Sequence, residues 1–330
     1  MMHSRPNPNA PMAIAASWLA ALSAGIVILG LVACGQGLGA IIGGCRWIGV
    51  TLPLHRQPWA LVNQPSLAFS TDGTAIGYWL GGTVACLLIA TLVIPVVPRP
   101  RGLTSELMAI QISWMASVLG LGWIALLDPW DGHISRFLRL HEMSPALVWI
   151  VPVLGAWAAL MPTLRLLALV RGAQPQLGRS GRVLTVVFHL VLPACVWIMG
   201  GLVMISRTSP VNQGTLLEGV LPFEVLWPPV LAAVLPSVAA LTLAWLAFPR
   251  PWVHHLEPVT LRSGVLLMLF AAALVGLQLV VGGPSGEGTC RGVVWTHADS
   301  RNNLRPWITP FSILGATAMP GIDDGGPDGE

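Results

Sequence analysis

Four polar residues lie within long apolar stretches of this sequence or at their edges, where ionisable side chains are otherwise rare. They are Glu106, Gln111, Arg165 and His189. Such groups are costly in apolar surroundings unless they pair, and they often mark functional sites. We expect Glu106 to pair with Arg165, and His189 to join them or Gln111 through hydrogen bonds. The cluster would be a proton or anion relay in a transporter, and would fix helix register in a scaffold.

A proline follows His189 at a distance that disturbs a helix. Pro193 lacks the N–H that would donate to the carbonyl of residue 189, four positions earlier. This spacing predicts an unpaired backbone acceptor beside the imidazole. Prolines also interrupt other apolar stretches, at Pro152, Pro162 and Pro236, and broken helices are common where transporters bind substrate.

A group of metal-ligand side chains lies between two of the apolar stretches. Asp128, Asp131, His133 and His141 are weak candidates for a divalent metal site, since carboxylate and imidazole both ligate such ions. The segment 131–142 also has the apolar and polar faces of a short amphipathic helix. A helix on the membrane surface explains that pattern without metal, and it is the interpretation we favour.

Three cysteines lie outside the central apolar stretches. Cys45 and Cys290 are candidates for a disulfide, the alternative being unpaired thiols. The residues Leu31-Val32-Ala33-Cys34 resemble a bacterial lipoprotein signal, in which cleavage precedes a cysteine that is then lipidated. An uncleaved first helix that ends in Cys34 is the alternative, and we favour it.

Composition identifies the surroundings of the chain. Of its 330 residues, 54% are hydrophobic and 9% are charged, whereas a soluble domain has about 25% charged residues. Seven stretches match the ~20 residues that a membrane-spanning helix needs. The sequence therefore predicts an all-α, multi-pass bundle over residues 1–282 and an outer tail over 283–330 with a disordered end. The predicted spans are 12–33, 76–97, 107–127, 147–170, 184–205, 226–248 and 264–282.

Two Gly-rich segments modify this scheme. The stretch from Gly37 to Leu54 is apolar but contains Arg46, and we predict an interfacial or re-entrant segment there. Gly77 and Gly81 have the GxxxG spacing that lets another helix approach closely.

Charge predicts the orientation. With the N-terminus inside, the inner segments carry nine arginines against two acids, a net +7, and the outer segments carry eight against twelve, a net −4. Seven spans then place the C-terminus outside. All 17 basic residues are Arg, whose codons are GC-rich, so we expect a bacterial inner membrane.

Three functional classes follow, in decreasing order of fit. A non-catalytic subunit or assembly protein comes first, since no catalytic constellation or phosphate-binding loop is present. A small-molecule or ion transporter using the polar cluster is second, and a metal-dependent enzyme third. The expected partners are the lipid bilayer and other membrane subunits. The net charge of +3 and the lack of a basic run argue against nucleic acid. No cofactor is assigned.

Overall fold

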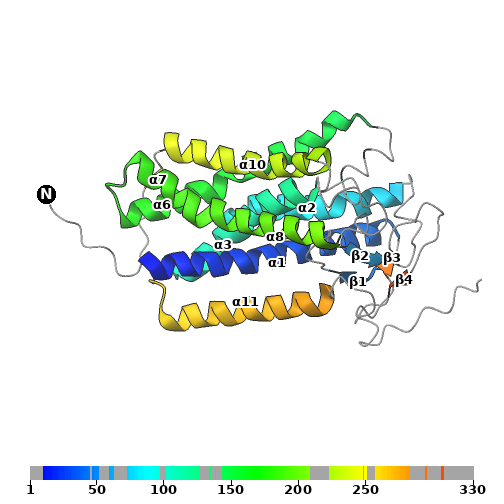
Figure 1. The fold of residues 1–330 in the computed structure, drawn as a ribbon, viewed down its shortest axis with the longest axis horizontal. Coiled ribbons are helices and arrows are strands. Elements are labelled where there is room, and N and C mark those ends of the chain that lie inside the picture. The colour runs from blue at the N-terminus through cyan, green and yellow to red at the C-terminus, as the bar shows by residue number, and fades with distance from the viewer. Residues whose placement is uncertain are drawn as a thin grey trace, which may run out of the picture.

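The computed structural model describes residues 10–44, 47–51, 59–62, 73–96, 102–125, 134, 138, 143–208, 223–247, 249–250, 257–282, 294–295 and 306–307. The helices run side by side along the long axis of the molecule, and the short strands lie at one end (Figure 1). The opposite end includes Arg171, Arg179, Arg182 and Arg250, and is called the arginine-rich end below.

Among the described residues, seven long helical segments make up the bundle, and several of them change helix type along their length. In chain order they are α1 (Ala10–Ile42); α2 (Gly73–Val96); α3 (Leu103–Met115) with the π-helix η2 (Ala116–Ile124); the 3-10 helix η3 (Pro145–Trp149) with α5 (Ile150–Ala158) and α6 (Leu160–Ala173); α7 (Arg179–Val186) with the π-helix η4 (Val187–Val191) and α8 (Leu192–Thr208); α10 (Phe223–Leu246); and α11 (Leu261–Gly282).

Each predicted span corresponds to one of these segments. Within the described ranges, six are long and apolar enough to cross a membrane, and α10 adds a further apolar helix, Val230–Leu246. The prediction of a multi-pass helical bundle is confirmed. The fourth span is broken at Ala159, three residues before Pro162, which cannot donate to a carbonyl of the preceding turn.

The segment Gly37–Leu54 differs from the predicted interfacial or re-entrant one. Its first part extends α1 to Ile42, and its later part contains β1 (Trp47–Thr51), which pairs antiparallel with β2 (Trp59–Val62). Helix α1 continues because its glycines are packed rather than exposed. A Cβ on Gly37 would overlap the ring of Trp47, so the missing side chain makes room for the indole. A second strand pair joins β3 (Val294–Trp295) to β4 (Pro306–Trp307).

The third span is the centre of the bundle. In its apolar window 83% of the residues are buried, against 17% for α11, which packs at the edge beside α1 (Figure 1). Its largest buried side chains include Ile110, Trp114, Met115 and Leu121. Glu106, Gln111 and Ser113 of α3 are therefore buried against other helices.

Helices α1 and α2 meet through two GxxxG motifs that face each other. A Cβ on Gly39 would overlap the carbonyl oxygen of Gly77, and one on Gly35 would overlap that of Gly81. The close approach predicted at Gly77 and Gly81 is present, and its partner is the antiparallel motif of α1. Contact between backbones gives dense packing that larger residues would prevent.

Candidate functional site

The four polar residues singled out in the sequence lie toward the arginine-rich end of the bundle. Glu106 is in the first turn of α3, and Gln111 follows it by five residues. Arg165 is eight residues from the end of α6, and His189 is ten residues from the start of α7. At 1.5 Å per helical residue, Gln111, Arg165 and His189 lie about 10–15 Å from these helix ends.

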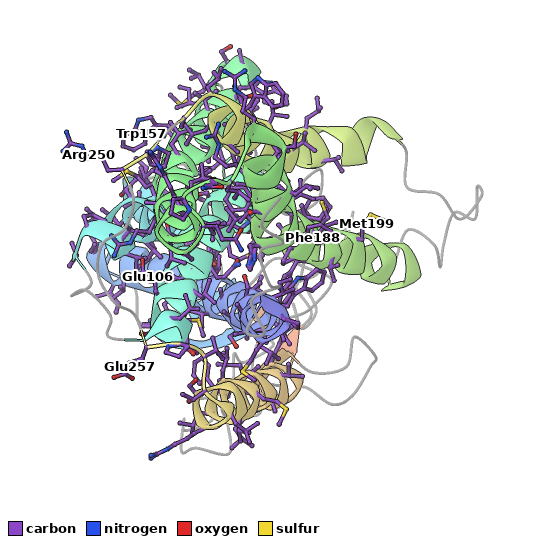
Figure 2. The ribbon with its side chains drawn as sticks, turned by 90° about the vertical axis from the view of Figure 1, so that its left-hand side faces the viewer. Glu106, Trp157, Phe188, Met199, Arg250 and Glu257 are labelled. Atoms are coloured by element: carbon purple, nitrogen blue, oxygen red, sulfur yellow. The ribbon has the colours of Figure 1, made fainter. Side chains whose placement is uncertain are left out.

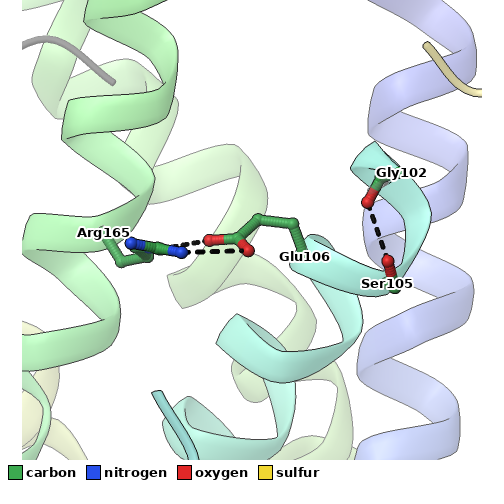
Figure 3. A network of polar contacts seen from close by, with 4 residues as sticks. All are labelled: Gly102, Ser105, Glu106 and Arg165. Atoms are coloured by element: carbon green, nitrogen blue, oxygen red, sulfur yellow. Dashed lines mark hydrogen bonds and ion pairs between the residues drawn. The ribbon is translucent and has the colours of Figure 1, made fainter. Parts of the chain in front are cut away.

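Glu106 and Arg165 form an ion pair with two contacts. Arg165 Nε donates to Glu106 Oε1, and Arg165 Nη2 donates to Oε2 at 3.3 Å (Figure 3). The exposed fraction is 2% for the Glu106 side chain and 17% for that of Arg165. Two parallel contacts fix the relative orientation of guanidinium and carboxylate as well as their separation. The pair expected from the sequence is therefore present, and it joins the third span to the fourth.

Contacts with neighbouring loops fix the start of α3, which carries Glu106. The Ser105 hydroxyl donates to the Gly102 carbonyl at 2.8 Å (Figure 3). The Leu103 N–H donates to the carbonyl of Glu257 at 2.9 Å. The second bond connects α3 to the segment before α11. The first turn of α3 is thus held at a defined position opposite Arg165. Seen from the arginine-rich end, Glu106 lies within the bundle and Glu257 at its edge (Figure 2).

The carbonyl of His189 accepts two side-chain donors. Gln111 Nε2 donates to it at 2.5 Å, and Ser17 Oγ at 3.4 Å; Gln111 Nε2 also contacts Ser17 Oγ at 3.0 Å. Pro193 cannot supply the helical N–H, so this acceptor is free for partners on α1 and α3. His189 does join Gln111, through its backbone carbonyl.

The carbonyls on either side of His189 are bound in the same way. Trp18 Nε1 of α1 donates to the Phe188 carbonyl at 3.2 Å, and Trp114 Nε1 of α3 donates to the Leu190 carbonyl at 2.9 Å. We call these three consecutive carbonyls and their donors the carbonyl clamp. It ties the fifth span to the first and third.

A change of helix type frees the first of these carbonyls, that of Phe188. In η4 the N–H of Leu192 donates to the carbonyl of Val187, five residues back, instead of that of Phe188. The Phe188 carbonyl therefore loses its ordinary helical partner. Short π-helical segments occur often at functional sites. Here the segment presents backbone oxygens to indole, amide and hydroxyl donors from other spans.

Two buried atoms at the clamp have no hydrogen-bond partner within the described part of the chain. They are Gln111 Oε1 and His189 Nδ1. Gln111 is fully buried, and His189 is half-buried. Buried polar atoms are nearly always paired, so each of these needs an explanation.

Sequence reasoning missed Ser17, Trp18 and Trp114 as parts of this site. A serine or tryptophan in an apolar helix is too common to stand out. The position of Ser17 could have indicated its contact with Gln111. Ser17 is seven residues into α1, and so lies at about the same depth in the bundle as Gln111. Whether the cluster serves transport or structure stays a prediction.

The other predicted sites fall largely outside the described residues. This applies to the metal candidates Asp128, Asp131, His133 and His141 and to both members of the Cys45–Cys290 disulfide. These expectations, and the metal-dependent enzyme, stay predictions. The described ranges contain no group of three or more metal-ligating side chains.

Residues near the predicted sites are described in part. From the segment 131–142, Ile134 and Leu138 are helical and are buried against the bundle core. Cys34 is a free thiol, and α1 continues past it to Ile42. Its lipidation also stays a prediction.

Three arginines make further polar contacts at the arginine-rich end of the bundle. Arg182 of α7 is buried, and its guanidinium donates to the carbonyls of Ala244 at 3.0 Å and Trp245 at 3.3 Å. Arg171 donates to the carbonyl of Pro249, and the guanidinium of Arg179 lies 5.7 Å from the ring centroid of Trp245. Cations at a helix C-terminus are stabilised by its unpaired carbonyls and dipole. These arginines hold the end of α10.

Replacing Arg182 with methionine is expected to lower the free energy of unfolding in detergent by roughly 2 kcal/mol, because two carbonyls lose a charged donor. Thermal unfolding followed by tryptophan fluorescence measures the change. Arg262→Met is the matched control, since Arg262 is exposed at the start of α11. Equal destabilisation by both substitutions would contradict the capping role.

Fold and site together define a multi-pass α-helical membrane protein whose spans are tied to one another by polar contacts. Comparison with protein-family models, with curated proteins and with solved structures finds no match to this chain. A more specific function is therefore inferred below from the geometry of the polar contacts and from the charge distribution.

Proposed function

We propose that the protein is a non-catalytic membrane subunit or assembly protein. One observation carries the proposal: the polar groups within the spans bind other spans. Glu106 binds Arg165, and donors on α1 and α3 bind the carbonyls of η4. Groups used in this way determine helix register and orientation. They support a rigid scaffold that presents its loops and lipid-facing helices to partners.

A copurification experiment tests the scaffold role. The tagged protein is extracted from its native membrane in mild detergent, with and without prior amine- and carboxyl-directed cross-linking. We expect at least one other membrane protein in fixed ratio with the chain. A chain that is homogeneous and alone under both conditions, and that transports solute in vesicles, would contradict the proposal.

The proposed location is a bacterial inner membrane, with the arginine-rich end in the cytoplasm. The support is the charge asymmetry, since arginine-rich short loops stay on the cytoplasmic side. Reporter fusions at Gly172 and Gly214 are expected to report cytoplasm and periplasm respectively. Alkaline phosphatase and a fluorescent protein are used at both positions, because they are active on opposite sides. The same side for both positions would exclude this topology.

A transporter is the second candidate, favoured by the unpartnered Gln111 Oε1 and His189 Nδ1 beside a π-helical break. Polar atoms without partners at membrane depth can bind a substrate or carry a proton. Purified protein in vesicles is the test, with His189→Ala as the variant, because Glu106→Gln breaks the ion pair and is expected to lower stability by itself. Transport lost at unchanged stability supports the transporter, whereas stability lost without any transport supports the scaffold.

A further inference from the structure

Three residues with buried polar atoms are linked by hydrogen bonds where α1, α3 and η4 meet. Gln111 Oε1 is a buried acceptor without a partner, and His189 Nδ1 is a buried ring nitrogen without one. A 2.5 Å hydrogen bond from Gln111 Nε2 to the His189 carbonyl joins these two residues. Ser17 Oγ lies 3.0 Å from the same Nε2 and is also buried.

The hydrogen-bonding capacity of these groups is only partly used. The Ser17 hydroxyl accepts from Gln111 and donates to the His189 carbonyl at 3.4 Å, which leaves one of its two lone pairs. Because Nε2 of Gln111 is the donor in both of its bonds, Oε1 is the acceptor atom of the same amide. Gln111 Oε1, one lone pair of Ser17 Oγ and His189 Nδ1 thus have no partner among the described residues. Buried water typically makes two to four hydrogen bonds, so this set fits one molecule.

We propose that Ser17, Gln111 and His189 form a binding site for a single water molecule inside the membrane-spanning bundle. The water donates to Gln111 Oε1 and Ser17 Oγ and accepts from His189 Nδ1–H. This arrangement sets the imidazole tautomer, with the proton on Nδ1. Ordered water commonly satisfies polar groups beside proline breaks in membrane helices. The site is independent of the scaffold role.

Solid-state NMR of the full chain, with ¹⁵N- and ¹³C-labelled histidine and in lipid vesicles, tests the proposal. Magnetisation transferred from water to the His189 ring is measured, and the His189→Phe spectrum identifies that ring among the eight histidines. We expect transfer to Nδ1 and a protonated Nδ1 in the unmodified protein. If the His189 ring receives magnetisation from lipid acyl chains but not from water, the proposal is overturned, irrespective of the results for the variants.

Two variants separate a bound water from water at the membrane surface. Gln111→Met removes the acceptor, and transfer should fall at least severalfold. Ser113→Ala is the matched control, because Ser113 is buried on the same helix but donates to the Ala90 carbonyl at 2.7 Å, away from η4. Transfer that survives in Gln111→Met would show that the water does not depend on this site, and would also overturn the proposal.

Discussion

Replacing Gly39 with alanine is expected to lower the free energy of unfolding by about 3 kcal/mol, at the upper end for inserting a methyl group into a packed core. The new Cβ would overlap the carbonyl oxygen of Gly77. The obstacle is backbone, which no rotamer change can move aside. Helices α1 and α2 must separate, and their separation weakens the packing along both GxxxG motifs. Unfolding in mixed detergent, followed by tryptophan fluorescence, measures the change.

Gly30→Ala is the matched control on the same helix. A Cβ at Gly30 meets no atom within 4 Å, so the substitution should leave stability unchanged or raise it by up to ~1 kcal/mol, since alanine is the better helix former. Gly77→Ala should behave like Gly39→Ala, because its Cβ would lie 2.5 Å from the Gly39 carbonyl. Similar stability for the Gly30 and Gly39 variants would show that the helices do not meet here.

Breaking the ion pair is expected to have the other large effect. Glu106→Gln leaves the Arg165 guanidinium without its carboxylate, and Arg165→Met leaves the buried carboxylate alone. Each single substitution should cost roughly 3 kcal/mol, the lower end for removing one partner of a buried pair, since Arg165 is partly exposed. The double variant should cost much less than the sum of the two. A double-mutant cycle on unfolding free energies measures this coupling.

Thr91→Val is a suitable control for the cycle. Thr91 donates to the carbonyl of Leu87 within its own helix, so its loss should not couple to Arg165. Additive effects of Glu106→Gln and Arg165→Met would contradict a direct pair. The exchange Glu106→Arg with Arg165→Glu should recover part of the stability, because the pair is restored with its charges reversed.

The sequence predicted the spans well because length and apolar composition suffice for them. It also indicated Glu106 with Arg165, since opposite charges within apolar segments have few other ways to be satisfied. The Pro193 spacing correctly indicated that the His189 carbonyl would need a partner from elsewhere. The spans and the proline effect depend on local chemistry that one chain segment carries by itself, and the ion pair depends only on the scarcity of charges within the spans.

Helix faces could not be predicted. Helices α1 and α2 are apolar all round, so no periodicity separates the buried face from the lipid-facing one. The motif Gly35–Gly39 was therefore not recognised as the partner of Gly77–Gly81. Backbone acceptors posed a second difficulty. The bond from Trp18 to the Phe188 carbonyl depends on the π-helical turn at η4, which residue types do not predict.

The carbonyl clamp has a consequence for the order of assembly during synthesis. Its donors on α1 and α3 precede their acceptors by up to 172 residues, so they emerge from the ribosome long before η4 exists. The contact between α1 and α2 needs only the first two spans and can form at once. Glycine packing must therefore hold the first two spans together until the fifth span supplies the carbonyl acceptors for Ser17, Trp18 and Gln111. Arrival of η4 then adds the hydrogen bonds that tie the first and third spans to the fifth.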